Sequence, residues 1–190
     1  MIFFNGGLYV HIPKCAGTSI RRVLLDSGPT TLLCNVGDPG KKLGQSPNGY
    51  NPHEHPQRLI DSLGWGAILN LWKFTFVRDP WDRFASWYLW KNDGRSFDRF
   101  LKQTLQSSSN PPRQSDYFSV RDGFYDFIGK VESITEDWRI VKEQLGIEED
   151  LPKLNVGPGT RNYRDMYDPS TRALVARHEH YIISRFNYSF

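Results

Sequence analysis

The segment from His11 to Ser19, with the sequence HIPKCAGTS, carries residue types that bind phosphate groups. It follows an apolar run and precedes a helical pattern, and strand-to-helix turns of this kind hold anions at the helix N-terminus. Lys14 supplies a positive charge, Gly17 lets the backbone approach an anion closely, and the next two residues supply hydroxyl groups. The segment lacks the Gly-x-x-x-x-Gly-Lys-Ser/Thr spacing of a P-loop, which disfavours a standard nucleoside triphosphate site. The alternative is an ordinary strand–turn–helix with an exposed lysine.

A second segment, from Arg78 to Ser86 with the sequence RDPWDRFAS, has a similar position after an apolar run. The planar guanidinium of Arg78, at the strand end, could bind a phosphate with two hydrogen bonds. Ser86 comes about two helical turns later and reaches the same anion only if the chain folds back. The alternative is structural: Asp79-Pro80 is a common N-cap and first-turn pair, and Arg83 would be a surface ion-pair partner.

The elements that must position these segments follow from apolar patterns. Apolar runs rich in β-branched and aromatic residues predict strands at residues 8–12, 74–77 and 127–131. Apolar periodicity and capping residues predict helices that begin near residues 18, 56, 80, 96, 133 and 168. Since strands alternate with helices, the expected fold is α/β, with a central, mostly parallel sheet flanked by helices. At 190 residues, the chain is expected to form one domain over residues 1–190.

Particular residues are expected to begin these helices. Thr18 or Ser19 would cap the first one, Ser133 with Glu136 matches a capping box, and Asp168-Pro169 would open a terminal helix. In the helix after Pro80, apolar residues recur at helical spacing, which predicts an inward-facing stripe. The members of this stripe are Trp81, Phe84, Ala85, Tyr88 and Leu89.

Composition and charge exclude several classes of protein. The hydrophobic fraction of 38% supports a buried core, and the net charge of +3 is too small for a protein that coats nucleic acid. Two cysteines cannot build a disulfide framework or a four-thiolate zinc site. The sequence contains no apolar run long enough to span a bilayer, and residues 1–5 do not resemble a secretory signal. A cytoplasmic protein without a membrane span is therefore expected.

Taken together and in this order, the two segments resemble those of sulfotransferases that use 3′-phosphoadenosine 5′-phosphosulfate (PAPS). The chain is similar to the Golgi carbohydrate sulfotransferases and to their compact bacterial counterparts. Residues 127–132, 163–165 and 186–190 fit the same family pattern, whereas residues 28–52 and 91–124 are not matched. The resemblance implies a P-loop-like, sulfotransferase-like architecture.

The resemblance also implies a role for each segment. The first would bind the 5′-phosphosulfate through its loop residues, which are Pro13, Lys14, Cys15, Ala16, Gly17, Thr18 and Ser19. Within this loop, Lys14 would stabilise the bridging oxygen as the phosphate leaves. Arg78 and Ser86 would bind the 3′-phosphate, and Ser86 would contact both that phosphate and the lysine. Apart from the resemblance, Arg161 and Arg164 in a Gly- and Pro-containing loop could close over the nucleotide, bind an anionic acceptor, or be solvated loop residues. The product would be adenosine 3′,5′-diphosphate (PAP), and no metal is required.

Transfer to a hydroxyl acceptor needs a general base with a pKa near neutrality. His53 is the candidate that aligns with the base histidine of the family, and His55 and Glu54 are the alternatives. The remaining histidines, at positions 11, 178 and 180, are expected to pack within the fold or to lie on its surface.

These residues predict an enzyme that transfers a sulfuryl group from PAPS to a hydroxyl of a carbohydrate or a small metabolite. Two alternatives remain: a nucleotide phosphotransferase of P-loop descent, and a catalytically inactive homologue that keeps only the nucleotide site. The missing P-loop spacing argues against the first, and the presence of Lys14 and Ser86 argues against the second. Loops 35–55 and 91–124 are expected to line the acceptor side.

Overall fold

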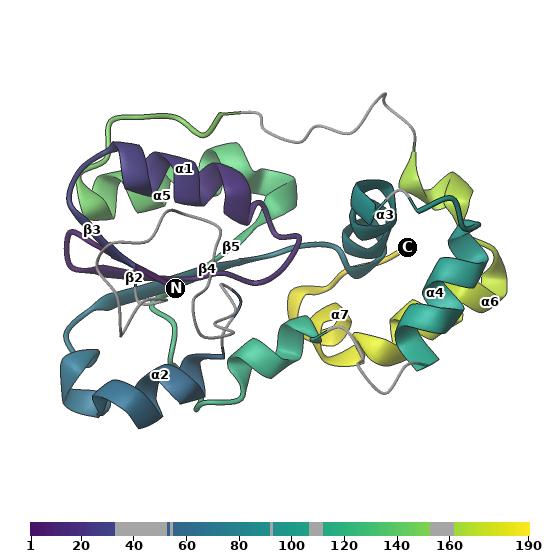
Figure 1. The fold of residues 1–190 in the computed structure, drawn as a ribbon, viewed down its shortest axis with the longest axis horizontal. Coiled ribbons are helices and arrows are strands. Elements are labelled where there is room, and N and C mark those ends of the chain that lie inside the picture. Colours follow the sequence, from purple (N-terminus) through teal and green to yellow (C-terminus); the bar gives the residue numbers. More distant parts are fainter. Residues whose placement is uncertain (33–52, 54, 92, 107–111, 153–161) are drawn as a thin grey trace. The chain divides into compact units, whose positions relative to one another are not determined.

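The computed structural model describes residues 1–32, 53, 55–91, 93–106, 112–152 and 162–190. The chain forms two compact units (Figure 1). The sheet unit comprises Met1–Val77 and Tyr117–Leu154. The helical unit comprises Arg78–Asp116 and Asn155–Phe190.

The sheet unit is built on a five-stranded sheet with the strand order β3-β1-β2-β4-β5. Its strands are β1 (Ile2–Phe4), β2 (Gly7–Val10), β3 (Thr30–Leu32), β4 (Trp72–Val77) and β5 (Phe127–Lys130). β1 pairs antiparallel with both β2 and β3, whereas β4 pairs in parallel with both β2 and β5. All strands except β1 therefore run in one direction, and the predicted mostly parallel sheet is confirmed.

Helices cover both faces of this sheet. The described helices of the unit are α1 (Gly17–Asp26), α2 (Pro56–Leu63) and α5 (Ile134–Leu145), with the short 3₁₀ helices η1 (Trp65–Ala67) and η3 (Val131–Ser133). α1 and α5 lie on one face of the sheet and α2 on the other (Figure 1). The predicted α/β class is confirmed.

The two central strands, β2 and β4, end at the same edge of the sheet. They are parallel neighbours, with Val10 opposite Thr75, and the Thr75 hydroxyl donates to the Val10 carbonyl oxygen at 2.8 Å. Every residue of β2 is buried, as expected for a strand covered on both faces. The segments after Val10 and Val77 therefore leave the sheet at the carboxyl ends of their strands, which is where α/β sheets generally bind ligands.

The helical unit consists of helices packed around an aromatic core. Its elements are α3 (Pro80–Lys91), α4 (Phe97–Gln106), η4 (Tyr163–Met166), α6 (Pro169–His178) and α7 (His180–Phe186), and the chain passes into the sheet unit through η2 (Gln114–Phe118). The core residues are Trp81, Phe84, Phe97, Phe100, Leu101 and Val175. Leu89 is 48% exposed, so the prediction that it faces inward is wrong. The buried residues of α3 all lie in its first half.

Two helix starts test the capping predictions. Ser133 precedes α5, but its hydroxyl donates to Asp137 at 2.9 Å and makes no capping bond, so the predicted capping box with Glu136 is wrong. Asp168 does cap α6, because its side chain accepts from the Thr171 N–H while the Thr171 hydroxyl accepts from the Asp168 N–H. Among the helices in the described ranges, none has the length and apolar character needed to cross a membrane.

Candidate functional site

The first segment forms the loop between β2 and α1, and its backbone is strained. Lys14 and Ala16 both adopt left-handed conformations, with φ angles of 66° and 58°, on either side of Cys15. For a residue with a side chain, this conformation costs about 1–3 kcal/mol and persists mainly where a site requires it. Left-handed residues that alternate with right-handed ones are typical of the backbone nests that bind anions.

α1 begins directly after this loop, at Gly17, with Ala16 as its N-cap residue. Neither Thr18 nor Ser19 caps the helix, contrary to expectation, because both lie inside it. The N–H groups of a first helical turn have no acceptor within their own helix, and the positive end of the helix dipole lies there. The loop and the helix start therefore combine backbone donors with a positive potential, which suits an anion.

The loop packs against His11, the residue after β2. A Cβ atom on Gly17 would lie 1.7 Å from His11 Nε2 and 2.0 Å from its Cδ2. Glycine is therefore required at position 17 because the imidazole occupies the space of a side chain. The sequence predicts that Gly17 lets the backbone approach an anion, and no pattern in it indicates this contact with His11.

His11 is an uncharged packing residue. Its ring is 7% exposed, and Nδ1 is buried without a hydrogen-bond partner among the described residues. Burial lowers the pKa of His11 well below its ordinary value, and the neighbouring His53 and Arg21 lower it further. The imidazole is therefore neutral at pH 7 and supports the loop by packing.

His53, the predicted general base, lies against His11. The centroids of the two rings are 4.2 Å apart, and His53 Nδ1 lies 3.3 Å from the His11 carbonyl oxygen. Since a carbonyl only accepts, this hydrogen bond needs the proton on Nδ1 and leaves Nε2 as the basic nitrogen of the neutral ring. The Tyr117 hydroxyl donates to the His53 carbonyl oxygen at 2.7 Å and fixes the main chain there.

His55, an alternative base, has a different position. It is the N-cap residue of α2, and its ring stacks on that of Tyr117 with centroids 4.7 Å apart. Glu54, the other alternative, lies outside the described residues. The contacts of His53 connect it to His11, which packs against the loop between β2 and α1, whereas the stacking of His55 connects it to Tyr117.

The second segment begins at Arg78, directly after β4. Arg78 Nε donates to Asp82 Oδ2 at 2.8 Å, in an ion pair whose side chains are both partly exposed. The Asp79 carboxylate accepts from the N–H groups of Trp81 at 2.9 Å and Asp82 at 3.1 Å, so Asp79 caps α3, as the structural alternative predicted. The Tyr163 hydroxyl donates to the same carboxylate at 3.1 Å, and burial raises the pKa of Asp79. The start of α3 is thereby fixed, and Asp82 orients the guanidinium of Arg78.

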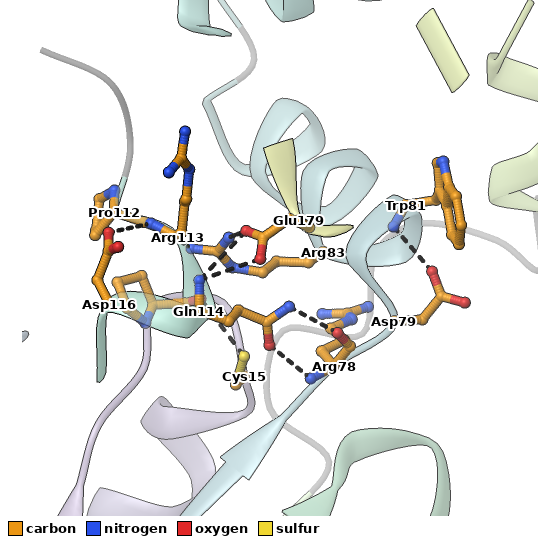
Figure 2. A network of polar contacts seen from close by, with 11 residues as sticks. Cys15, Arg78, Asp79, Trp81, Arg83, Pro112, Arg113, Gln114, Asp116 and Glu179 are labelled. Atoms are coloured by element: carbon orange, nitrogen blue, oxygen red, sulfur yellow. Dashed lines mark hydrogen bonds and ion pairs between the residues drawn. The ribbon is translucent and has the colours of Figure 1, made fainter. Parts of the chain in front are cut away.

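Arg83 is fully buried, so the expectation of a surface ion pair is wrong. Its Nη1 donates to Glu179 Oε1 at 2.7 Å, and both side chains are 0% exposed (Figure 2). Its Nη2 donates to the Pro112 carbonyl oxygen at 2.9 Å. Burial raises the pKa of Glu179, although the charge of Arg83 acts in the opposite direction. Glu179 lies between α6 and α7, where the sequence predicted one continuous helix.

Gln114 joins this ion pair to Arg78 (Figure 2). Its N–H lies 3.3 Å and 3.2 Å from the two carboxylate oxygens of Glu179. Its side-chain Oε1 accepts from the Arg78 N–H, and its Nε2 donates to the Arg78 carbonyl oxygen, both at 2.9 Å. Gln114 and Glu179 were not predicted from the sequence. Arg83 lies outside the apolar stripe of this helix, so no local pattern indicates that it is buried and needs an acidic partner.

The predicted site residues therefore form two groups. The loop residues 13–19 and His53 belong to the sheet unit, whereas Arg78 and Ser86 belong to the helical unit. Ser86 is half-buried in the second turn of α3, and Arg161 lies outside the described residues. Within the described ranges, no three His, Cys, Asp or Glu side chains are grouped in a way that could hold a metal ion.

Comparison with known proteins gives one family. The profile described as "Sulfotransferase family" matches residues 5–185. An uncharacterized protein of Archaeoglobus fulgidus is 32% identical over 97 residues, which are 48% of this chain and 81% of that protein. No solved structure matches the chain.

Proposed function

Because the chain belongs to the sulfotransferase family, we propose that it transfers a sulfuryl group from PAPS to a hydroxyl group of a carbohydrate or a small metabolite. Residues 1–190 would form one sulfotransferase domain, and the family match over residues 5–185 includes parts of both units. The observation that carries the proposal is the strained loop at Lys14 and Ala16, which leads into the N-terminus of α1 at the carboxyl end of β2.

The residues of the first segment fit a 5′-phosphosulfate group. The left-handed backbone and the start of α1 suit an anion, and the Lys14 side chain is partly exposed. In the proposal, the N–H groups of residues 16–19 and the exposed hydroxyl of Thr18 hold the phosphate. Ser19 is 8% exposed and its N–H donates to the Ala16 carbonyl oxygen at 3.1 Å, so the N–H groups of residues 16–18 would make most of the contact.

The residues of the second segment fit a 3′-phosphate. Arg78 is partly exposed, and Asp82 orients its guanidinium through Nε. A fork of N–H donors in a fixed orientation suits a phosphate, because two parallel hydrogen bonds can form at once. In the proposal, Ser86 contacts the same phosphate.

The chemistry divides between His53 and Lys14. PAPS supplies an activated sulfuryl group: the acceptor oxygen forms a bond to sulfur while the bond from sulfur to the 5′-phosphate oxygen breaks. His53 Nε2 accepts the proton of the acceptor hydroxyl. Lys14 stabilises the negative charge that develops on the leaving phosphate oxygen, and positioning with electrostatic stabilisation supplies most of the acceleration.

Calorimetric titration with PAP and ADP tests the proposal. We expect PAP to bind and ADP to bind much more weakly, because ADP has no 3′-phosphate for Arg78. Arg78→Ala should weaken PAP binding by about 10- to 100-fold, since hydrogen bonds to charged groups contribute roughly 1.5–3 kcal/mol. Arg99→Ala, at an exposed arginine of α4, is the matched control and should leave both affinities unchanged.

Other outcomes favour the alternatives. Equal binding of PAP and ADP would indicate a nucleotide phosphotransferase, and binding of neither ligand by folded protein would overturn the proposal. If PAP binds but PAPS is never consumed with any hydroxyl acceptor, the chain is an inactive nucleotide-binding homologue.

A further inference from the structure

We propose that Gln114 is a positioning residue of the 3′-phosphate site, which holds the main chain of Arg78 and is itself held by the buried Arg83–Glu179 pair. This inference rests on the proposed function, in which Arg78 binds the 3′-phosphate. It adds three residues, Gln114, Arg83 and Glu179, that would act on the nucleotide only through Arg78.

The side-chain amide of Gln114 forms hydrogen bonds with both the N–H and the carbonyl oxygen of the Arg78 main chain. Its Oε1 accepts from the Arg78 N–H and its Nε2 donates to the Arg78 carbonyl oxygen, both at 2.9 Å. Gln114 is 0% exposed, so its amide is shielded from competing water. Two opposed hydrogen bonds to one residue fix the direction of its main chain.

Arg78 is at a point where the sheet no longer provides this support. The pairing of β4 with β5 ends at Val77 and Lys130, one residue before Arg78. The amide of Gln114 therefore continues the role of a strand partner for one more residue. Because a fork of donors binds a phosphate only in the correct orientation, the direction of the main chain at Arg78 affects binding of the anion.

The buried ion pair fixes Gln114 in turn. Glu179 accepts the Gln114 N–H at 3.3 Å and 3.2 Å and the Arg83 guanidinium at 2.7 Å. The other side of the guanidinium donates to the Pro112 carbonyl oxygen at 2.9 Å. The buried Arg83–Glu179 pair thus holds Pro112 through Arg83 and Gln114 through Glu179. Because both charged side chains are 0% exposed, water does not compete for these hydrogen bonds.

The test compares PAP with adenosine 5′-monophosphate (AMP), which shares the adenosine and the 5′-phosphate but lacks the 3′-phosphate. Gln114→Met keeps the size of the side chain and removes both hydrogen bonds. We expect it to weaken PAP binding by about tenfold, because a misoriented Arg78 would lose about one hydrogen bond to the 3′-phosphate. AMP binding should change less than about twofold. Gln103→Met, at an exposed glutamine of α4, is the control and should change neither affinity.

A double variant separates positioning from general loosening of the fold. If Gln114 acts through Arg78, then Arg78→Ala with Gln114→Met should lose no more PAP affinity than Arg78→Ala alone. Should Gln114→Met fail to fold, Gln114→Glu takes its place in the same titrations, because it keeps the acceptor for the Arg78 N–H and removes the donor to its carbonyl.

Equal weakening of PAP and AMP binding would overturn the inference, because it indicates a merely structural role. Unchanged PAP binding in the Gln114 variant, with a clear loss in Arg78→Ala, would also overturn it while the proposed function stands. If wild-type protein binds PAP no more tightly than AMP, both the proposed function and this inference fail.

Discussion

Glu179→Ala is expected to lower the free energy of unfolding by about 3–5 kcal/mol, because it removes the carboxylate that pairs with the buried Arg83 guanidinium. Arg83 is 0% exposed, and its ion pair with Glu179 at 2.7 Å is the interaction that offsets the cost of burying its charge. Urea denaturation of the wild type and the variant measures the change. If the pair positions Gln114, the same variant should weaken the binding of PAP more than the binding of AMP.

Two controls identify the cause of this loss. Asp150→Ala breaks the ion pair with Lys142, in which Asp150 is 90% exposed, and should leave the denaturation midpoint nearly unchanged. Arg83→Met combined with Glu179→Leu removes both charges and should be clearly more stable than Glu179→Ala alone. A double variant no more stable than the single one would mean that an unpaired charge is not the source of the destabilisation.

Gly17→Ala is expected to destabilise the sheet unit by about 1–3 kcal/mol and to abolish detectable PAP binding. The new Cβ would lie 1.7 Å from His11 Nε2, so either the imidazole or the start of α1 must move. Any such movement displaces the loop that we propose for the 5′-phosphate. Denaturation and calorimetric titration measure the two effects.

Gly66→Ala is the matched control, because a Cβ at Gly66 in η1 would meet nothing within 4 Å. A second check combines Gly17→Ala with His11→Ala, which removes the clashing ring. The double variant should be more stable than the sum of the two single effects predicts, since the two sites share one contact. Additive effects would show that the destabilisation has another origin than the Gly17–His11 contact.

The elements with long apolar patterns were predictable, and the shortest ones were not. β2 and β4 follow from runs of buried residues, because both faces of these strands are covered, and the partly buried β5 follows from its short run of Phe127 and Ile128. β1 and β3 have three residues each and no pattern that distinguishes them from loops. They become strands by pairing with each other, β1 also with β2, and this tertiary context is not visible in a short window of sequence.

The site shows the same division. Lys14 and Arg78 could be proposed from the sequence because each lies in a motif next to a strand end. Gln114 and Glu179 are 36 and 96 positions away from their partners Arg78 and Arg83, so no local pattern connects them. Burial reverses the interpretation of Arg83 as well, since a surface arginine and a buried one are identical in sequence.

The measurement that tests the central claim most directly is a pH titration of the two ³¹P resonances of PAP bound to an excess of protein. A free phosphate monoester has its second pKa near about 6, and a neighbouring cation lowers it. We predict that binding lowers the titration midpoints of both phosphates. Lys14→Met should restore only the midpoint of the 5′-phosphate, and Arg78→Ala only that of the 3′-phosphate. Resonances that titrate as in free PAP, or a reversed pairing of variants and phosphates, would contradict the account.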